Sequence, residues 1–509
     1  MLDAPLITGQ HLIAGTWVTS ENFFDSDPVT GEAESFYAGG ADEINEAATA
    51  AAAAFAEYGW TTREARAAFL EKIAGEIEAR GPALTQIAMA ETGLPAARLE
   101  GERGRTCGQL RLFAAHIRDG KYLDIRHDSA LPDRAPLPRP DLRLMQRPVG
   151  PVGVFGASNF PLAFSTAGGD TASALAAGCP VVYKGHPGHP GTCEIVAQAI
   201  AAAIEATGMP KGTFSMVQSN TNEAGGALVQ HPEIKAVGFT GSFGGGKALF
   251  DLAMARPEPI PFFGELGSLN PVFVMPAALA ARGAAMGEGW AQSLTMGVGQ
   301  FCTNPALVLL PEGPEGDAFA EAALRLLNET APQPMLTAGT ASAYAKGVEM
   351  LSGAGLDRLT GAQTCSIREG APAVFQVKAA DWLARPELAR EVFGPAGILI
   401  RTSSPEEMLK VAKGFHGQLT ATLLMDDADI DAAKPLIPVL ESKAGRVLAN
   451  AFPTGVEVAD AMVHGGPFPA STNFGATSVG TMAIRRFLRP VCYQNLPEAL
   501  LPADLQGLG

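Results

Sequence analysis

Apolar and polar positions alternate with different periods along the chain, which separates it into regions. In residues 42–93 the large apolar side chains recur every three to four positions among many alanines, a pattern that predicts packing helices. Residues 125–147 change to Pro, Arg and Asp, which favours an exposed arm that bridges domains or subunits. The tail from about residue 484 mixes basic and apolar residues and is a candidate partner for that arm.

Beyond the arm, short apolar runs alternate with helical segments. Each of the first four runs ends in a turn rich in Gly, Pro, Asn or Ser, and they occupy residues 152–155, 180–183, 213–217 and 234–239. Between the second and third runs, an apolar stripe predicts a helix with Thr192 as its N-cap and its end at Gly208. Such repetition predicts a parallel sheet, with ligands beyond the carboxyl ends of the strands.

A second alternating region spans residues 265–465. Its predicted strands lie near residues 272–274, 306–310 and 397–400, and a helix is expected near 316–328. The chain is therefore predicted to be of the α/β class, with two sheet-based regions and a small β arm.

Composition and charge exclude several functional classes. The 509 residues are 47% apolar and 18% charged, which is typical of a globular protein. A formal net charge of −16 argues against nucleic acid or an anionic membrane and favours small molecules and further copies of the chain as partners. Neither a basic segment followed by an apolar one at the amino terminus nor a membrane-length apolar run occurs, so we expect a cytoplasmic location.

The stretch VGFTGSFGGGKALF, residues 237–250, contains a distinctive glycine-rich turn. Gly241, Gly246 and Lys247 fit the P-loop pattern up to its last position, where Ala248 replaces the hydroxyl residue that would bind magnesium. That replacement argues against a nucleotide-hydrolysing enzyme. The alternative is a dinucleotide site, in which backbone N–H groups at a helix start face a pyrophosphate.

Three polar residues stand in settings suited to covalent chemistry. Cys302 lies in the turn GQFCTNP, whose backbone amides can point at the sulfur and favour a nucleophilic thiolate. Glu265, in PFFGELGSLNP, has apolar neighbours that should raise its pKa toward that of a general base. Asn159, in GASNFPLAF, offers an amide N–H to a developing oxyanion. Each setting alone also suits a structural role, so their joint occurrence carries the interpretation.

The six cysteines are scattered and contain no C-x-x-C pair, so no zinc site or redox dithiol is expected. A metal site at His186 and His189 is not expected either. His464 begins HGGPFP, which is similar to the oxyanion loop of lipases, but the chain has no G-x-S-x-G.

The chain resembles the aldehyde dehydrogenase superfamily over nearly its whole length. The motifs ASNFP, VVYK, FTGS, ELGSLNP, GQFC, EVFGP and HGGPFPAS occur in the family's order and spacing. The segments KGHPGHP, ELGSLNP and HGGPFPAST resemble the branch that contains 2-oxoglutarate semialdehyde (2,5-dioxopentanoate) dehydrogenases and NADP-linked long-chain aldehyde dehydrogenases.

The resemblance implies roles for individual residues. Cys302 matches the nucleophile that attacks the aldehyde, Asn159 the oxyanion donor, and Glu265 the base that hydrolyses the thioester. The implied cofactor contacts are Lys184 at the adenosine ribose, Gly241 and Ser242 at the pyrophosphate, and Glu391 and Phe393 at the nicotinamide and its ribose. Phe160 and His464 are candidates for the substrate pocket, and a structural turn role for His464 stays open.

The implied cofactor is NAD(P). NAD-preferring members carry a glutamate three positions after the lysine, whereas this chain has Pro187, which removes repulsion against a 2′-phosphate. No arginine occurs in KGHPGHP, so NADP is favoured over NAD through Lys184 and His186. Lys247 is then expected to be a solvated helix residue.

Together these features predict a Rossmann-like cofactor domain (1–124 and 148–264), an α/β catalytic domain (265–465) and bridging segments (125–147 and 484–509) of a homodimer or homotetramer. The predicted reaction oxidises an aldehyde, with 2,5-dioxopentanoate favoured, through a cysteine thiohemiacetal and thioester. A medium- or long-chain aliphatic aldehyde is the alternative substrate, and a catalytically silent cofactor-binding protein is the alternative of another class. A dianionic product favours a cation at the entrance, for which Arg282 and Arg446 are candidates.

Overall fold

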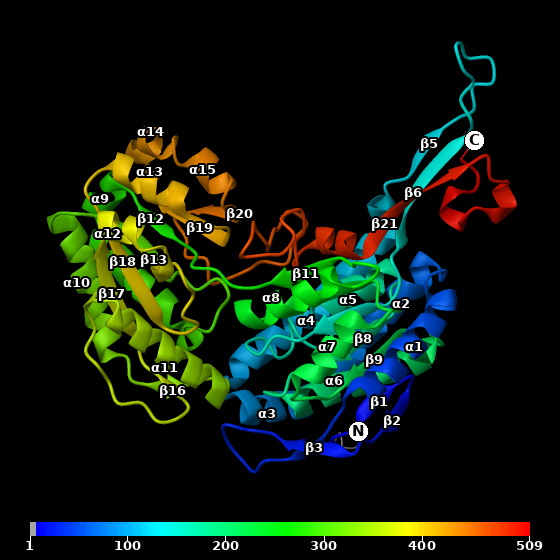
Figure 1. The fold of residues 1–509 in the computed structure, drawn as a ribbon, viewed down its shortest axis with the longest axis horizontal. Helices are drawn as coiled ribbons and strands as arrows, with labels where there is room; N and C mark the ends of the chain where they lie inside the picture. The colour runs from blue at the N-terminus through cyan, green and yellow to red at the C-terminus, as the bar shows by residue number, and fades with distance from the viewer. Residues whose placement is uncertain (1–6, 509) are drawn as a thin grey trace.

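The computed structural model describes residues 7–508, which form two lobes and a projecting arm (Figure 1). Residues 1–6, part of the amino terminus expected to lack a targeting segment, lie outside the described residues, as does residue 509 at the end of the predicted tail segment. Among residues 7–508, no helix combines the length and the hydropathy needed to cross a bilayer.

The first lobe is built on a seven-stranded sheet in the order β11-β10-β7-β8-β9-β1-β2. Its strands β7 to β11 pair in parallel, whereas β1 and β2 add an antiparallel edge. The strands are β1 (His11–Ile13), β2 (Thr16–Val18), β7 (Val152–Phe155), β8 (Val181–Lys184), β9 (Phe214–Val217), β10 (Ala236–Thr240) and β11 (Phe262–Glu265). A hairpin of β3 (Asn22–Asp25) and β4 (Ser35–Ala38) lies beside this sheet.

Helices surround this first sheet, because the parallel strands are apolar on both faces. They are α1 (Ala41–Tyr58), α2 (Arg63–Ala79), α3 (Gly81–Thr92), α4 (Ala96–Asp119), α5 (Gly169–Ala177), α6 (Pro190–Thr207), α7 (Asn222–Gln230) and α8 (Phe243–Met254). The long helix α4 packs along α2 and α3 and reaches the side of the lobe that faces the second lobe (Figure 1).

The second lobe repeats the α/β plan with the sheet order β15-β17-β18-β13-β12-β19-β20. Its strands are β12 (Val272–Val274), β13 (Leu307–Pro311), β15 (Asp357–Arg358), β17 (Ala373–Lys378), β18 (Ala396–Thr402), β19 (Gln418–Leu424) and β20 (Ala444–Ala449). Its helices are α9 (Pro276–Thr295), α10 (Pro314–Glu329), α11 (Ala338–Gly353), α12 (Ala379–Ala384), α13 (Pro405–Gly414), α14 (Ile430–Ala433) and α15 (Ile437–Glu441). A two-stranded ribbon joins β14 (Gln333–Pro334) to β16 (Glu369–Gly370).

The arm is a three-stranded antiparallel sheet of β5 (Arg126–Asp128), β6 (Leu142–Pro148) and β21 (Leu488–Gln494). The register runs from Leu488 opposite Pro148 to Gln494 opposite Leu142. The predicted pairing of the tail with the Pro/Arg segment is therefore confirmed.

The predicted α/β class and the strand positions are confirmed, and the main error concerns the start of α6. We expected Thr192 to cap this helix, but α6 begins at Pro190. The carboxylate of Glu91, on α3, takes the capping role: it accepts from the backbone N–H groups of Gly191 (2.7 Å) and Thr192 (3.0 Å), and from the Thr192 hydroxyl (2.6 Å). A side chain from a different helix thus replaces the local cap.

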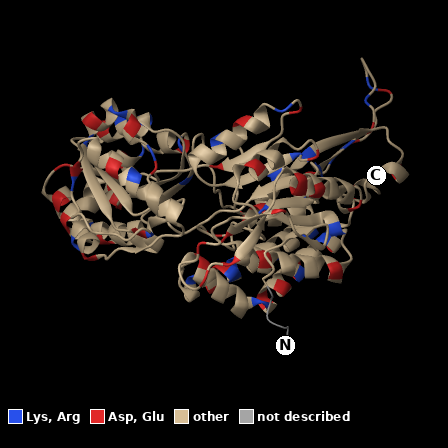
Figure 2. Cartoon of the chain, turned by 60° about the horizontal axis from the view of Figure 1, so that its bottom comes forward, with Lys and Arg blue, Asp and Glu red and all other residues tan. Residues whose placement is uncertain are grey.

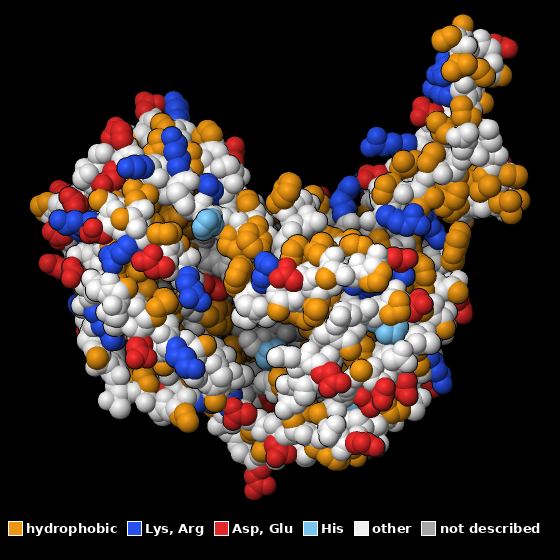
Figure 3. Space-filling model, viewed as in Figure 1, with side chains coloured by type: hydrophobic (Ala, Val, Ile, Leu, Met, Phe, Trp, Pro, Cys, Tyr) orange, Lys and Arg blue, Asp and Glu red, His pale blue; other side chains and the backbone are white. Residues whose placement is uncertain are grey.

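The predicted boundary between residues 264 and 265 falls within β11, so the domain limits stay a proposal. Acidic and basic side chains are mixed over the helices of both lobes (Figure 2). In the space-filling view, the surface is hollowed between the two lobes (Figure 3).

Candidate active site

Three predicted or candidate residues meet where the two lobes adjoin. The Cys302 sulfur lies 3.4 Å from Nε2 of His464, and the same nitrogen lies 3.0 Å from Oε1 of Glu265. The second carboxylate oxygen, Oε2, accepts from the Ser478 hydroxyl at 3.3 Å. The structure therefore brings a thiol, an imidazole and a carboxylate into one contact group. His464, which was a candidate only for the substrate pocket or a structural turn, contacts Cys302 and Glu265 directly.

Each member comes from a different part of the fold. Glu265 ends the edge strand β11, and Cys302 follows the short helical turn Met296–Gly299 after α9. The segment carrying His464 returns from the second lobe and pairs with the end of β11, through Leu266 N to Ala470 O at 3.0 Å. The site is thus assembled only when the chain has closed across both lobes.

The turn before Cys302 is held in an uncommon backbone conformation. Gly297, Val298 and Gly299 all have positive φ, which is costly for a β-branched residue such as Val298. A Cβ at Gly299 would lie 2.4 Å from the carbonyl carbon of Gly394, so only glycine fits this close approach. The geometry explains the glycine of the GQFC motif.

Asn270, which the sequence analysis did not single out, anchors the nucleophile. Its amide Nδ2 donates to the backbone oxygens of Cys302 and Asn304, both at 2.9 Å. Asn270 itself has a φ of 48°, a conformation that asparagine tolerates better than most residues. Its position in the ELGSLNP motif was the sequence feature that could have identified it as a residue of the site.

The local electrostatics differ from both sequence expectations. Burial, together with the nearby Glu265 carboxylate, raises the pKa of Cys302 well above its usual range, so the turn does not favour a resting thiolate. For Glu265, burial alone would raise the pKa, but His464, Cys302 and Ser478 together lower it. The carboxylate is therefore ionised and the thiol protonated in the resting site, the reverse of the two predictions.

Asn159 lies beside this contact group. Its Nδ2 donates to the backbone oxygen of Gln300 at 3.0 Å, which fixes the amide two residues from Cys302. The neighbouring Phe160 packs edge-to-face on Phe301, with ring centroids 5.5 Å apart. The amide can therefore offer its second N–H to an oxyanion, and Phe160 stays a candidate for the substrate pocket.

The residues implied to hold the adenosine ribose lie at the end of β8. Lys184 Nζ donates to the Ser219 oxygen at 2.6 Å, and burial lowers its pKa to about 8. His186 stacks on His189 with ring centroids 5.1 Å apart, and burial next to His189 and Lys184 holds the pKa of His186 well below its usual range. At neutral pH His186 is therefore uncharged.

The glycine-rich turn leads into α8 as predicted. Gly241 and Ser242 are exposed, and the Ser242 hydroxyl caps α8 by accepting from Gly245 N at 3.4 Å. The exposed first-turn N–H groups suit an anionic pyrophosphate. Lys247 pairs with Asp251 at 2.6 Å on the surface, as expected for a solvated helix residue.

Glu391 and Phe393 lie close to the Cys302 turn. Ser268 N donates to Glu391 Oε1 at 3.4 Å, and burial raises the pKa of this carboxyl to about 8. Asn304 Nδ2 donates to the oxygen of Gly394 at 3.0 Å, which ties the segment containing the half-buried Phe393 to the turn of the nucleophile. A partly protonated carboxyl here suits hydrogen bonding to a ribose hydroxyl.

The two arginine candidates for the substrate entrance differ in their surroundings. Arg282 pairs with Asp426 at 3.0 Å and also donates to Asn450, so its charge is already partnered. Arg446 donates to the backbone oxygens of Pro453 and Gly455, and because Cys302 influences its pKa it stays a candidate near the site. Two arginines of α4, Arg98 and Arg105, also lie near the site, and sequence analysis missed them because it assigned no chemistry to this helix.

The contact group has the donor types of a metal site, since single ligand atoms of Glu265, Cys302 and His464 lie within 4.8 Å of one another. A cation bound there would occupy the nucleophile and the base together. The prediction of a metal-free site stays a prediction.

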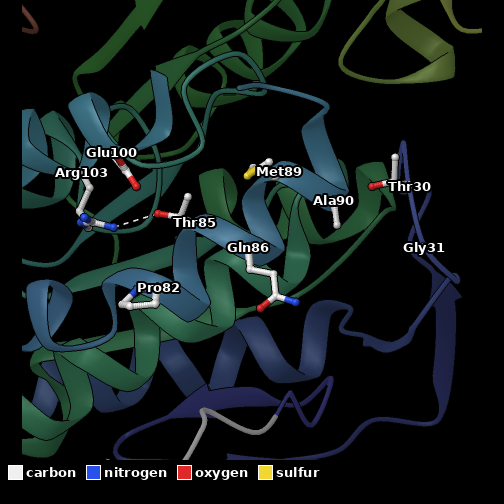
Figure 4. A pocket seen from close by; sticks show the side chains of 9 residues that line it. All are labelled: Thr30, Gly31, Pro82, Thr85, Gln86, Met89, Ala90, Glu100 and Arg103. Atoms are coloured by element: carbon white, nitrogen blue, oxygen red, sulfur yellow. Dashed lines mark hydrogen bonds between the residues drawn. The ribbon is translucent and has the colours of Figure 1, made fainter. Parts of the chain in front are cut away.

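A second pocket, with a volume of about 580 Å³, lies over α3 and α4 (Figure 4). Its one arginine, Arg103, donates to Thr85 Oγ1 and to Gly81 O, both at 2.9 Å. Its lining contains no cysteine or histidine, so we place the chemistry at the contact group of Cys302, His464 and Glu265.

Comparison with known proteins agrees with this geometry. Residues 17–489 match the model of the aldehyde dehydrogenase family. Alpha-ketoglutaric semialdehyde dehydrogenase 2 of Azospirillum brasilense is 52% identical over 515 residues, which cover 99% of this chain and 97% of that protein. Alpha-ketoglutaric semialdehyde dehydrogenase of Acinetobacter baylyi is 52% identical over 468 residues, or 91% of this chain and 89% of that protein.

Solved structures share the fold. A betaine aldehyde dehydrogenase of Staphylococcus aureus in complex with NAD+ aligns with a TM-score of 0.80 at 22% identity, covering 96% of each chain. A 1-pyrroline-5-carboxylate dehydrogenase aligns with a TM-score of 0.80 at 21% identity, covering 95% of this chain and 92% of that one. At these identities the likeness establishes the fold alone.

Proposed function

Because this chain belongs to the aldehyde dehydrogenase family, we propose that it oxidises 2,5-dioxopentanoate, the semialdehyde of 2-oxoglutarate, to 2-oxoglutarate with NAD(P). The substrate rests on two relatives named for this aldehyde, each 52% identical to the chain. The chemistry rests on one observation, the contact of Cys302 and Glu265 with a shared nitrogen of His464.

The first step is activation of the nucleophile. Because the Cys302 thiol is protonated at rest, it needs a base, and the Glu265–His464 pair lies within reach of the sulfur. The thiol proton passes to this pair, which leaves an imidazolium next to the Glu265 carboxylate and the new thiolate. The opposite charges stabilise one another in a site that excludes bulk water.

The thiolate then attacks the aldehyde carbon and forms a thiohemiacetal. Its oxyanion is stabilised by the Asn159 amide, which the Gln300 carbonyl holds in place, and by the backbone N–H of Cys302. When bound, NAD(P)+ would accept a hydride from the thiohemiacetal, which would leave a thioester on Cys302. Lys184, Gly241, Ser242, Glu391 and Phe393 are the residues that would hold the cofactor.

Hydrolysis of the thioester completes the cycle. The ionised Glu265 takes a proton from water, the hydroxide adds to the acyl carbon, and Cys302 leaves as the thiolate. One aldehyde, one oxidised cofactor and one water yield one carboxylate, one reduced cofactor and protons.

Absorbance of the reduced nicotinamide tests this proposal with purified enzyme and an aldehyde panel. We expect kcat/KM to be highest with 2,5-dioxopentanoate, lower with pentanal and lowest with decanal. A higher kcat/KM with decanal would favour the aliphatic alternative, for which the aromatic side chains of Phe160, Phe164 and Phe301 would form the entrance. Absence of turnover with every aldehyde and both cofactors would favour the silent cofactor-binding protein.

We propose that NADP is favoured over NAD only weakly, by about tenfold or less. Pro187 leaves room for a 2′-phosphate, and Lys184 supplies a positive charge at the end of β8. The neutral His186 can donate a hydrogen bond to the ribose or phosphate but adds no charge. The ratio of kcat/KM for the two cofactors measures this preference.

A homodimer or homotetramer joined through the arm is the proposed assembly, supported by the projection of β5, β6 and β21 from the first lobe (Figure 1). Light scattering of the purified chain should give the mass of two or four copies, and a single-copy mass would contradict it. A cytoplasmic location stays a prediction from the sequence.

A further inference from the structure

Helix α4 presents two arginines to the active-site aromatic residues. Arg98 and Arg105 are seven residues apart, which places them two turns apart on the same face of the helix. The Arg98 guanidinium lies 4.5 Å from the Phe160 ring and 4.8 Å from the Phe301 ring. That of Arg105 lies 5.6 Å from the Phe164 ring, which in turn faces His464 with ring centroids 6.0 Å apart.

The two guanidinium groups differ in how fully they are partnered. Arg98 donates to the backbone oxygen of Asn159 at 3.4 Å and lies 3.6 Å from Glu102, so it is held in place next to the oxyanion residue. Arg105 uses only Nη1, which donates to the Val456 oxygen. Its Nε and Nη2 atoms are buried and have no hydrogen-bond partner among the described residues.

The two unpartnered atoms have a matching geometry. Nε and Nη2 form one edge of the planar guanidinium, and such an edge binds the two oxygens of a carboxylate through parallel hydrogen bonds. Leaving charged donors buried without acceptors costs free energy that an anionic ligand would recover. The Arg446 guanidinium lacks this feature, because Nη1 and Nη2 are both engaged and only Nε is unpartnered.

The surroundings of Arg105 hold both acidic groups and a second arginine. Burial and the neighbouring Arg98 lower the pKa of Arg105, whereas Glu102, Glu457 and the Cys302 sulfur, once it is ionised, raise it. Of these, Glu102 uses Oε1 to accept from the backbone N–H groups of Leu162 and Ala163, at 2.8 and 2.9 Å. Glu457 lies on the exposed loop beyond Val456. The guanidinium edge is thus left for a ligand.

We propose that Arg105 binds the carboxylate of the substrate at the end away from the aldehyde, while Arg98 positions Asn159. This inference rests on the proposed function, since it assumes a short aldehyde with a carboxylate at its far end. The aromatic rings of Phe160, Phe164 and Phe301 enclose the carbon chain between Arg105 and Cys302. Arg105 is therefore the residue that selects a carboxylated aldehyde over an aliphatic one.

Two five-carbon aldehydes test the assignment, 5-oxopentanoate and pentanal, because they differ only in the terminal carboxylate. The measured quantity is the ratio of their kcat/KM values. In Arg105→Gln the amide keeps a donor for the Val456 oxygen but removes the charge, so the ratio should fall about 10- to 100-fold with kcat/KM for pentanal nearly unchanged. Arg105→Lys should restore part of the ratio.

Arg111→Gln is the matched control, because this arginine of the same helix pairs with Glu78 on the surface. Its ratio should equal that of the wild type. Inhibition by glutarate, measured with pentanal as substrate, should weaken in Arg105→Gln but not in Arg111→Gln.

The results distinguish a wrong assignment of Arg105 from a wrong substrate. If the wild type prefers the carboxylated aldehyde and Arg105→Gln keeps that preference, the assignment to Arg105 is wrong and the proposed substrate stands. Equal losses with both aldehydes would also overturn the assignment, since a structural role predicts them. A wild type without preference for the carboxylate would overturn the substrate and Arg105 together.

Discussion

Two cysteine–histidine pairs lie in this chain at nearly equal distances, yet only one can act on a substrate. Cys302 is 3.4 Å from His464, and Cys193, on α6, is 3.3 Å from His189. In the second pair, burial alone would raise the pKa of Cys193, but the adjacent His189 together with hydrogen bonds to Tyr183 and Thr166 lowers it. Cys193 is therefore the more easily ionised thiol of the two.

The accessibility of the two thiols to a substrate is the reverse of their order of acidity. Cys193 is fully buried among Tyr183, Ser165 and His189, so no aldehyde can reach it. Cys302 is only partly buried and lies near the Asn159 amide and the Glu265 carboxylate. A lowered thiol pKa is therefore not by itself a sign of a nucleophile, because a nucleophile also needs an approach path, an oxyanion donor and a base.

Replacing the nucleophile should give the largest effect. In Cys302→Ser the hydroxyl is far less acidic than a thiol, so kcat should fall at least about 1,000-fold. Steady-state rates with 2,5-dioxopentanoate measure the loss. Full turnover in this variant would show that the covalent step runs through another residue.

His464→Gln comes next, because it removes the proton acceptor of Cys302 while leaving the sulfur in place. We expect the first-turnover burst of reduced nicotinamide to slow about 100-fold. His416→Gln, at an exposed histidine, is the control. An unchanged burst would show that His464 is a structural turn residue, the alternative that the sequence left open.

Cys193→Ala tests whether the second cysteine–histidine pair has a structural role. The variant removes the sulfur that contacts His189 Nδ1 and the Tyr183 hydroxyl, whereas His189 Nε2 keeps the Ala157 oxygen and Tyr183 keeps Ser165. The free energy of unfolding should therefore drop by about 1–3 kcal/mol, with kcat/KM within about threefold of the wild type. Cys107→Ala is the reference, because this buried thiol donates to the Ala74 oxygen at 3.5 Å and otherwise packs in the apolar core. Denaturant unfolding compares the two. A large loss of turnover in Cys193→Ala would contradict a purely structural pair.

A smaller effect concerns Lys184, which shares the buried region of the second pair. Burial lowers its pKa to about 8, so the ammonium is present below pH 8 and is lost as the pH rises through that value. The KM for NADP should therefore rise several-fold between pH 7 and pH 9, and that for NAD much less. Parallel changes for both cofactors would argue against a contact of Lys184 with the 2′-phosphate.

The sequence predicted the first pair's nucleophile but not its environment. Cys302, Glu265 and Asn159 lie in short motifs whose glycines and prolines mark turns at strand ends, and motifs of this kind are local. The contact of His464 with Glu265 joins positions 199 residues apart. No local pattern encodes that contact, which arises from the return of the chain across β11.

The two pKa errors have the same origin. The apolar neighbours of Glu265 along the chain suggested a raised pKa, but its spatial neighbours are His464, Cys302 and Ser478, which lower it. The arginines of α4 were missed for a related reason, because a helix of mixed charge looks solvated until it is known which face packs against the site. Periodicity thus predicted the elements, and tertiary contact determined their chemistry.

The most direct test of the central claim traps the acyl group on the sulfur. Glu265→Gln should form the thioester but hydrolyse it slowly, so that after one turnover with 2,5-dioxopentanoate and cofactor the acyl group accumulates. Peptide mapping by mass spectrometry then identifies the modified cysteine. We expect one acyl group on Cys302 and none on Cys193. An acyl group on another residue, or none at all beside a full burst of reduced cofactor, would contradict the covalent mechanism.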